Sequence, residues 1–181
     1  MDRSNDVSQN RIAARNRIPL ILSGLGLVFL LVGIVQLVAD QRRVIKESMA
    51  VPPSLAGMPL TAQVYGRPAL AEIEQLHGKG FALVDGAVGH YGNGTATVWI
   101  SGTWAPFLAA RQVEDMRDRI AEGRSPFELT GTREVDGTMI YVLEGMGQMH
   151  YYFQVDKRVV WLAASPELAE QSLQELLSDL K

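Results

Sequence analysis

Residues 127–164 read FELTGTREVDGTMIYVLEGMGQMHYYFQVDKRVVWLAA, and this stretch decides the fold. It contains four short runs rich in β-branched and aromatic residues, and every break between two runs carries a turn signal. Asp136-Gly137 suits a two-residue hairpin, Gly145-Met146-Gly147 a slightly longer one, and Asp156-Lys157 a tight one. The pattern predicts four antiparallel strands at residues 127–135, 138–144, 149–155 and 158–164.

Further elements are expected on both sides of this stretch. Strands at about 81–91 and 95–101 are joined at Gly92-Asn93-Gly94, a strong hairpin signal. Apolar spacing predicts helices from Pro68 to about His77 and from Pro106 to Glu122. A closing helix is expected to start at Ser165-Pro166-Glu167, where the serine can cap and proline suits the first helical position.

The expected order is therefore helix, two strands, helix, four strands, helix. This order predicts an α+β fold, in which an antiparallel sheet of about six strands is covered mainly on one face by helices. A parallel, doubly wound sheet is disfavoured, because the connections between adjacent strands are too short for a parallel crossover.

The C-terminal quarter of the chain carries a resemblance. Residues 151–164 (YYFQVDKRVVWLAA), followed by the helix start Ser165-Pro166-Glu167-Leu168, form an aromatic strand, a charged turn and an apolar strand before an amphipathic helix. This pattern resembles the C-terminal part of bacterial membrane-anchored ectodomains of unknown function. The resemblance implies a bacterial, extracytoplasmic domain, and it transfers no catalytic or binding residue.

Residues 18–39 form an uncharged run of 22 residues. As a helix this run is roughly 33 Å long, enough to cross the hydrocarbon core of a bilayer. A cleaved signal peptide is the rival interpretation, and Arg11, Arg15 and Arg17 before the run would suit one. The run exceeds the length of a signal-peptide core, so a retained single-pass transmembrane helix is preferred.

The span divides the chain into regions. Residues 1–17 are expected to be a basic cytoplasmic tail and residues 40–60 a juxtamembrane linker, with an extracytoplasmic domain at 61–181. Arginines and lysines are nearly balanced across the span, and the larger basic count before it favours a cytoplasmic N-terminus. The expected location is the cell membrane.

Small and polar residues fall on one stripe of the predicted span. Ser23, Gly26 and Gly33 share this stripe, and Gln36 lies on its shoulder. Small residues let helices approach closely, and an amide can bond across them, so this stripe predicts a contact with a membrane-protein partner. The alternative is that glycine is simply common in transmembrane helices.

Composition and motifs exclude several functions. Residues 50–181 hold ten Arg and Lys against sixteen Asp and Glu, which argues against nucleic-acid binding. The chain has no cysteine, so disulfides and thiolate metal sites are excluded. No hydrolase or nucleotide-binding motif appears, so no enzyme activity and no cofactor are predicted. Met146, Met149 and His150 lie close enough to suggest a soft metal site, but core packing is the preferred interpretation.

The strand at 149–155 carries a candidate interaction surface. Strand alternation places His150 and Tyr152 on one face, and Tyr151 and Phe153 on the other. At least two of these rings are therefore expected opposite the helix-covered face, where exposed aromatic residues would suit an interface. Packing within the sheet is the alternative.

These features predict a single-pass membrane protein whose non-enzymatic extracytoplasmic domain binds a partner, as an accessory subunit of a larger membrane complex. The lipid bilayer and a membrane protein are the expected partners. The alternative function is a small-ligand-binding or envelope-sensing domain, which would hold an apolar molecule between the sheet and the helices.

Overall fold

The computed structural model describes residues 27–39, 49–77 and 83–180. The chain divides into two compact units, Met1–Val44 and Ile45–Lys181. Residues 27–39 of the first unit form a helix with exposed side chains. No helix within the described ranges is long and apolar enough to cross a membrane. The predicted span at 18–39 begins before the described residues, so it stays a prediction.

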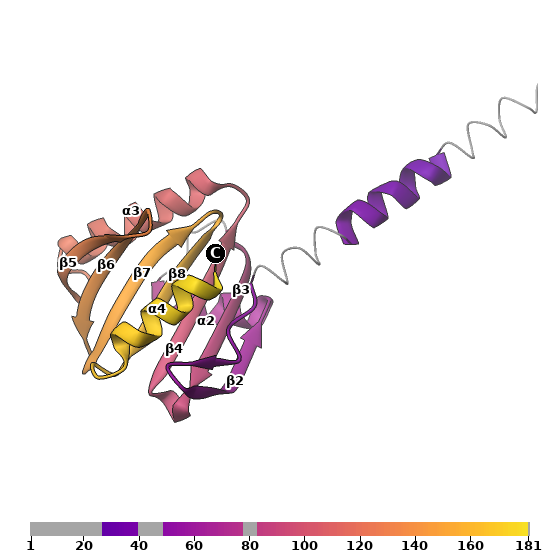
Figure 1. The fold of residues 1–181 in the computed structure, drawn as a ribbon. Coiled ribbons are helices and arrows are strands. Elements are labelled where there is room, and N and C mark those ends of the chain that lie inside the picture. Colours follow the sequence, from indigo (N-terminus) through magenta and orange to yellow (C-terminus); the bar gives the residue numbers. More distant parts are fainter. Residues whose placement is uncertain (1–26, 40–48, 78–82, 181) are drawn as a thin grey trace, which may run out of the picture. The chain divides into compact units, whose positions relative to one another are not determined.

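The second unit is built on one antiparallel sheet whose eight described strands follow the order β1-β2-β3-β4-β8-β7-β6-β5 (Figure 1). The strands are β1 (Ser54–Leu55), β2 (Met58–Tyr65), β3 (Leu83–Tyr91), β4 (Ala96–Thr103), β5 (Glu128–Val135), β6 (Thr138–Gly145), β7 (Gln148–Val155) and β8 (Arg158–Ala164). Its helices are α2 (Arg67–His77), α3 (Pro106–Ala121) and α4 (Ala169–Asp179), and a single 3-10 turn, η1 (Gly92–Gly94), joins β3 to β4.

The predicted four-stranded meander is confirmed as β5 to β8. Asp136 and Gly137 both have positive φ, and so do Met146 and Gly147, as two-residue turns between twisted strands require. The second turn is therefore one residue shorter than expected, because Gly145 still belongs to β6. The α+β class is confirmed.

The predicted number of strands is too small. β1 and β2 were not expected, and they add two antiparallel strands beyond β3. Met49, Val51 and Leu55 are also buried in the core, although the sequence analysis placed them in a linker. Prolines in this segment weaken the strand signal, yet a short outer strand tolerates proline.

The expectation that helices cover mainly one face is wrong. α4 packs on the face that carries Val98, Phe153 and Leu162. α2 and α3 lie on the opposite face, which carries Trp99 and Trp161 (Figure 1). β4 and β8 lie in the middle of the sheet and are buried on both faces, so each face of this central pair needs a cover.

The closing helix starts later than expected. α4 begins at Ala169, and Leu168 precedes it without a side-chain cap. Ser165 instead accepts a hydrogen bond at its carbonyl from the Leu168 N–H at 3.0 Å, so the Ser-Pro-Glu segment forms a separate turn. Leu173, Leu176 and Leu177 of α4 pack against the sheet.

Candidate ligand-binding pocket

A pocket of about 390 Å³ opens on the sheet face covered by α2 and α3. Its walls come from the C-terminal half of α3, the loop that leads into β5, the turn between β6 and β7, and the sheet itself. The residues that line it are Trp99, Met116, Arg119, Ile120, Arg124, Ser125, Pro126, Phe127, Met146, Gln148, His150 and Trp161.

Aromatic rings form the floor of this pocket. Trp99 and Trp161 are direct partners on β4 and β8, so their rings rise from the same face. Phe127 lies tilted against Trp161, with ring centroids 5.2 Å apart, and against His150 at 4.5 Å. Beyond the pocket, Tyr152 stacks on Trp161 at 5.4 Å, which continues the row of rings across the sheet. The floor therefore presents wide apolar surfaces.

Hydrogen bonds hold the floor rings in place. The Trp161 indole N–H donates to His150 Nδ1 at 3.1 Å, and His150 Nε2 lies 3.0 Å from the Gly145 carbonyl. These partners assign the neutral imidazole with its proton on Nε2. The Trp99 indole N–H donates to Glu72 Oε1 at 3.0 Å. Both indole donors are thus engaged by the protein, and the ring faces are what remains for a ligand.

Burial sets the charge state of the histidine. Loss of solvent lowers the pKa of His150, and the hydrogen bond to the Gly145 carbonyl opposes this effect only in part. The lowered pKa agrees with the neutral tautomer that the hydrogen bonds assign. The floor of the pocket is consequently uncharged at neutral pH.

The rim of the pocket carries positive charge. Arg119 and Arg124 are the two basic side chains in the lining, and Arg124 pairs with Glu122 outside it. The pocket therefore combines an apolar floor with a basic rim.

Gly145 lets the rim loop lie close to the sheet, because a Cβ at this position would be 2.5 Å from Phe127 Cδ1.

The predicted interaction surface on β7 is only partly correct. The alternation is confirmed: Tyr151 and Phe153 face the α4 core, whereas Tyr152 belongs to the opposite cluster. The predicted exposure is wrong, because His150, Tyr151, Tyr152 and Phe153 are all buried. The reason is that the sheet is covered on both faces. Only His150 among them lines the pocket.

The structure does not bring the suggested soft metal ligands together. Met149 packs against the α4 core, whereas His150 points to the opposite face, and Met146 is 80% exposed at the turn. In the described ranges, no three His, Cys, Asp or Glu side chains are grouped to hold a metal ion.

The helix-packing prediction falls mainly outside the described residues. Ser23 and Gly26 lie there, so their contacts are not described. Gly33 and Gln36 belong to the helix at 27–39 and are exposed. This stripe stays a prediction.

Most pocket residues were not identified from sequence. No role was predicted for Trp99 or Trp161, and Phe127 only marked the start of the predicted strand at 127–135. Trp99 lies on β4, Trp161 on β8 and Phe127 directly before β5, so the three residues are far apart in sequence and no local spacing could reveal the pocket.

Comparison with known proteins places the chain in no family. No protein-family model and no curated protein matches it. Among solved structures, the extracellular domain of PknH from Mycobacterium tuberculosis is similar at 11% sequence identity, with a TM-score of 0.38. The match covers 68% of this chain and 78% of that chain. This distant likeness to a bacterial extracellular domain assigns neither a family nor a function.

Proposed function

We propose that this chain is a membrane-anchored extracytoplasmic protein whose domain binds a small apolar molecule that carries an anionic group. The observation that carries this proposal is the pocket of about 390 Å³ on the α2 and α3 face. Its volume lies within the range of small-molecule sites, which are about 300–1,000 Å³. The proposal selects the ligand-binding alternative of the sequence analysis.

The construction of the pocket supports binding. Trp99, Trp161 and Phe127 offer flat apolar surfaces at three positions around one hollow. The orientation of the two indoles is fixed by their hydrogen bonds to Glu72 and His150. Side chains that are already fixed lose little entropy when a ligand binds. More of the free energy gained by burying an apolar molecule there therefore contributes to the affinity.

The rim indicates the charge of the ligand. Arg119 and Arg124 are positive, and no carboxylate lines the described pocket. Guanidinium groups bind carboxylates and phosphates through charge-assisted hydrogen bonds. A molecule with a ring or short chain in the hollow and an acidic group at the rim fits this arrangement.

Calorimetry with a model ligand tests the proposal. The full chain, reconstituted in phosphatidylcholine nanodiscs, is titrated with naphthalene-2-carboxylate, and empty nanodiscs give the background. Ile120→Trp places a large ring at a lining position, whereas Ala121→Trp places it at an exposed neighbour on the same helix. We expect the first variant to weaken binding by about tenfold or more, and the second to leave it unchanged.

The role of charge is tested separately with the neutral naphthalene-2-carboxamide. We expect the carboxylate to bind more tightly, by about tenfold, and we expect Arg119→Gln with Arg124→Gln to abolish this preference. Absence of binding by both compounds, or binding that Ile120→Trp does not change, would contradict the proposed site.

The accessory-subunit function stays a prediction. Its supports were the transmembrane stripe, the exposed aromatic face and the lack of recognisable catalytic motifs, and the second is now corrected because those rings are buried. Detergent solubilisation of the full chain followed by native mass measurement addresses it directly. A strictly monomeric chain without a partner would count against it.

A further inference from the structure

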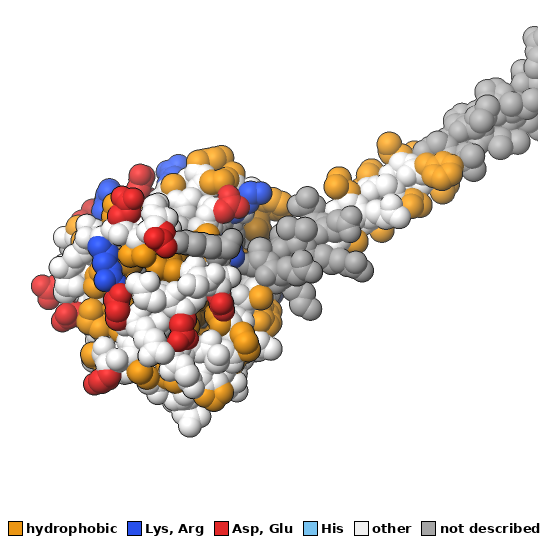
Figure 2. Space-filling model, in the orientation of Figure 1, with side chains coloured by type: hydrophobic (Ala, Val, Ile, Leu, Met, Phe, Trp, Pro, Cys, Tyr) orange, Lys and Arg blue, Asp and Glu red, His pale blue; other side chains and the backbone are white. Residues whose placement is uncertain are grey.

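Two large aromatic side chains are exposed where β4 leads into α3. Trp104 is 73% exposed and Phe107 is 70% exposed, although aromatic residues of the same sheet are otherwise mostly covered. They lie three positions apart, one in the connection and one in the first turn of α3. Hydrophobic surface is visible in Figure 2 at the edge of the molecule where α3 begins.

Hydrogen bonds fix the β4–α3 connection, which carries these rings. Thr103 Oγ1 lies 2.9 Å from the Ala105 carbonyl and 3.0 Å from the Lys157 carbonyl. Gln154 Nε2 donates to the carbonyls of Pro106 at 2.9 Å and Asp156 at 2.8 Å. These bonds tie the β4–α3 connection to the turn between β7 and β8. Hydrogen bonds therefore hold in place the connection that carries the exposed rings.

The chain joins the folded domain at this same end. Met49 is the first described residue of the domain, and its Sδ lies 3.4 Å from the position that a Cβ on Gly102 would occupy. Gly102 precedes Trp104 by two residues on β4. Nine residues, 40–48, separate the predicted span from Met49. A segment of this length reaches at most about 32 Å from the end of the predicted span.

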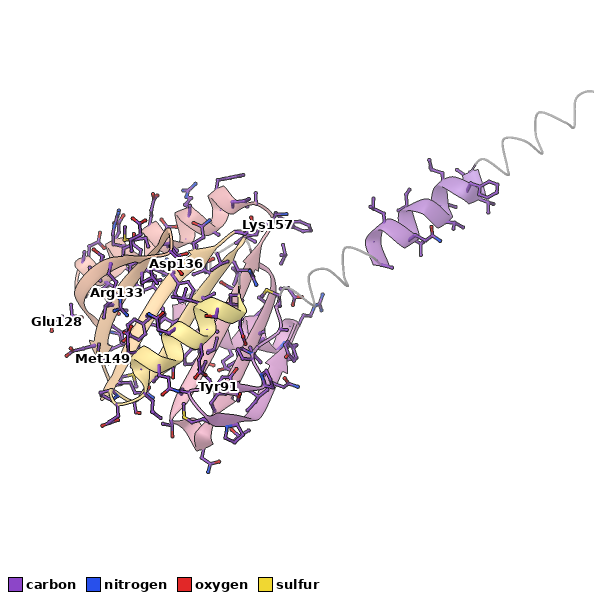
Figure 3. All side chains as sticks on the ribbon, viewed as in Figure 1. Tyr91, Glu128, Arg133, Asp136, Met149 and Lys157 are labelled. Atoms are coloured by element: carbon purple, nitrogen blue, oxygen red, sulfur yellow. The ribbon has the colours of Figure 1, made fainter. Side chains whose placement is uncertain are left out.

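Basic side chains accompany the rings. Lys157 is exposed on the turn that is bonded to Thr103, and Figure 3 labels it at the end of the sheet where α3 begins. Arg111 is exposed one helical turn after Phe107. Asp156 is also exposed beside Lys157. Tryptophan together with lysine or arginine is the combination found where proteins meet lipid headgroups.

We propose that the β4–α3 end of the domain rests on the membrane surface, with Trp104 and Phe107 inserted among the lipid headgroups. Lys157 and Arg111 contact the phosphates. The proposal rests on the predicted transmembrane span and is independent of the ligand pocket. This contact would turn the pocket rim away from the membrane, because Met146 and Gln148 lie at the opposite end of β7 from Lys157.

Lipid quenching of tryptophan emission tests this contact. The full chain is reconstituted in vesicles of phosphatidylcholine and phosphatidylglycerol, in which the phosphatidylcholine carries bromine near the headgroup. The chain contains three tryptophans, and Trp99 and Trp161 lie on the sheet face under α2 and α3. We expect brominated lipid to quench the wild-type chain and this quenching to be lost in Trp104→Phe. Absence of quenching, or quenching that Trp104→Phe retains, overturns the proposal, as does a chain that fails to enter the vesicles.

Spin labels provide a second measurement, since the chain has no native cysteine. A label at Phe107→Cys is compared with one at Glu128→Cys, an exposed position at the start of β5 that Figure 3 places away from Lys157. We expect the Phe107 label to be shielded from an aqueous nickel complex and reached by oxygen, and the Glu128 label to behave oppositely. Equal access to nickel, or close spin–spin coupling that shows a second copy on this surface, overturns the proposal.

Discussion

The two faces of the sheet differ in how completely they are filled, although the same strands supply both. Under α4, Tyr151, Phe153 and Leu162 are buried in one continuous core. Under α2 and α3, Trp99, Trp161 and Phe127 surround an open pocket. On the α4 face, aliphatic side chains such as Leu162 and Leu173 fill the space around the rings, whereas the two indoles of the pocket floor are held by hydrogen bonds with space left beside them. One face is therefore suited to stability and the other to binding.

The largest expected effect compares the same truncation on each face. Phe153→Ala removes a fully buried ring and should lower the free energy of unfolding by about 3–5 kcal/mol. Phe127→Ala removes a half-buried ring beside the pocket and should cost only about 1–2 kcal/mol. Urea unfolding of the full chain in nanodiscs, followed by circular dichroism, measures both values. Equal costs would show that the pocket face is packed as tightly as the α4 face.

A smaller effect is expected from acid, and it arises on the pocket face alone. His150 has a pKa below the ordinary value of 6.5 because it is buried. As the pH falls below 6.5, the unfolded chain takes up this proton before the folded chain does, so stability is lost with decreasing pH. The slope from this group is at most about 1.4 kcal/mol per pH unit.

Unfolding measurements between pH 7 and pH 5.5 stay above the range in which ordinary carboxylates titrate, and comparison with His150→Gln isolates the contribution of this group. His150→Gln should remove the part of the pH dependence of the unfolding free energy that arises from His150. The wild-type chain should show no contribution from this group between pH 7 and pH 8. If the free energy of unfolding of His150→Gln depended on pH in the same way as that of the wild-type chain, the acid sensitivity would not arise from His150.

The smallest effect compares two buried tyrosine hydroxyls. Tyr91, in the α4 core, donates to the Pro52 carbonyl at 2.9 Å, so Tyr91→Phe should cost about 1 kcal/mol. Tyr152, on the other face, has a buried hydroxyl with no partner among the described residues. Tyr152→Phe should therefore be neutral or stabilise the chain by up to about 1 kcal/mol. Thermal unfolding distinguishes the two, and a loss of stability in Tyr152→Phe would show that its hydroxyl is satisfied.

Much of the fold could be predicted because turns and helix spacing are local signals. Asp136-Gly137 and the glycines near Met146 set the ends of the meander strands, and Pro106 sets the start of α3. β2 was missed although Leu60, Ala62 and Val64 alternate with polar residues, because Pro59 interrupts the signal.

The prediction that helices cover mainly one face of the sheet failed for a different reason. The apolar run from Val159 to Ala164 already indicates a strand buried on both sides, and the sequence analysis did not draw this conclusion. The pocket depends on a further step, the pairing of β4 with β8. Trp99 and Trp161 become neighbours only through this non-local pairing, which no turn specifies.

The central position of β8 has a consequence for biogenesis. β8 pairs with both β4 and β7, so strand pairing joins β1–β4 to β5–β7 only through it. A nascent chain emerges from the ribosome with its N-terminus first, so residues 158–164 appear after every other described strand. Until they do, the exposed edges of β4 and β7 lack their shared partner and are open to mispairing. The two halves of the sheet can therefore join only after residues 158–164 have emerged.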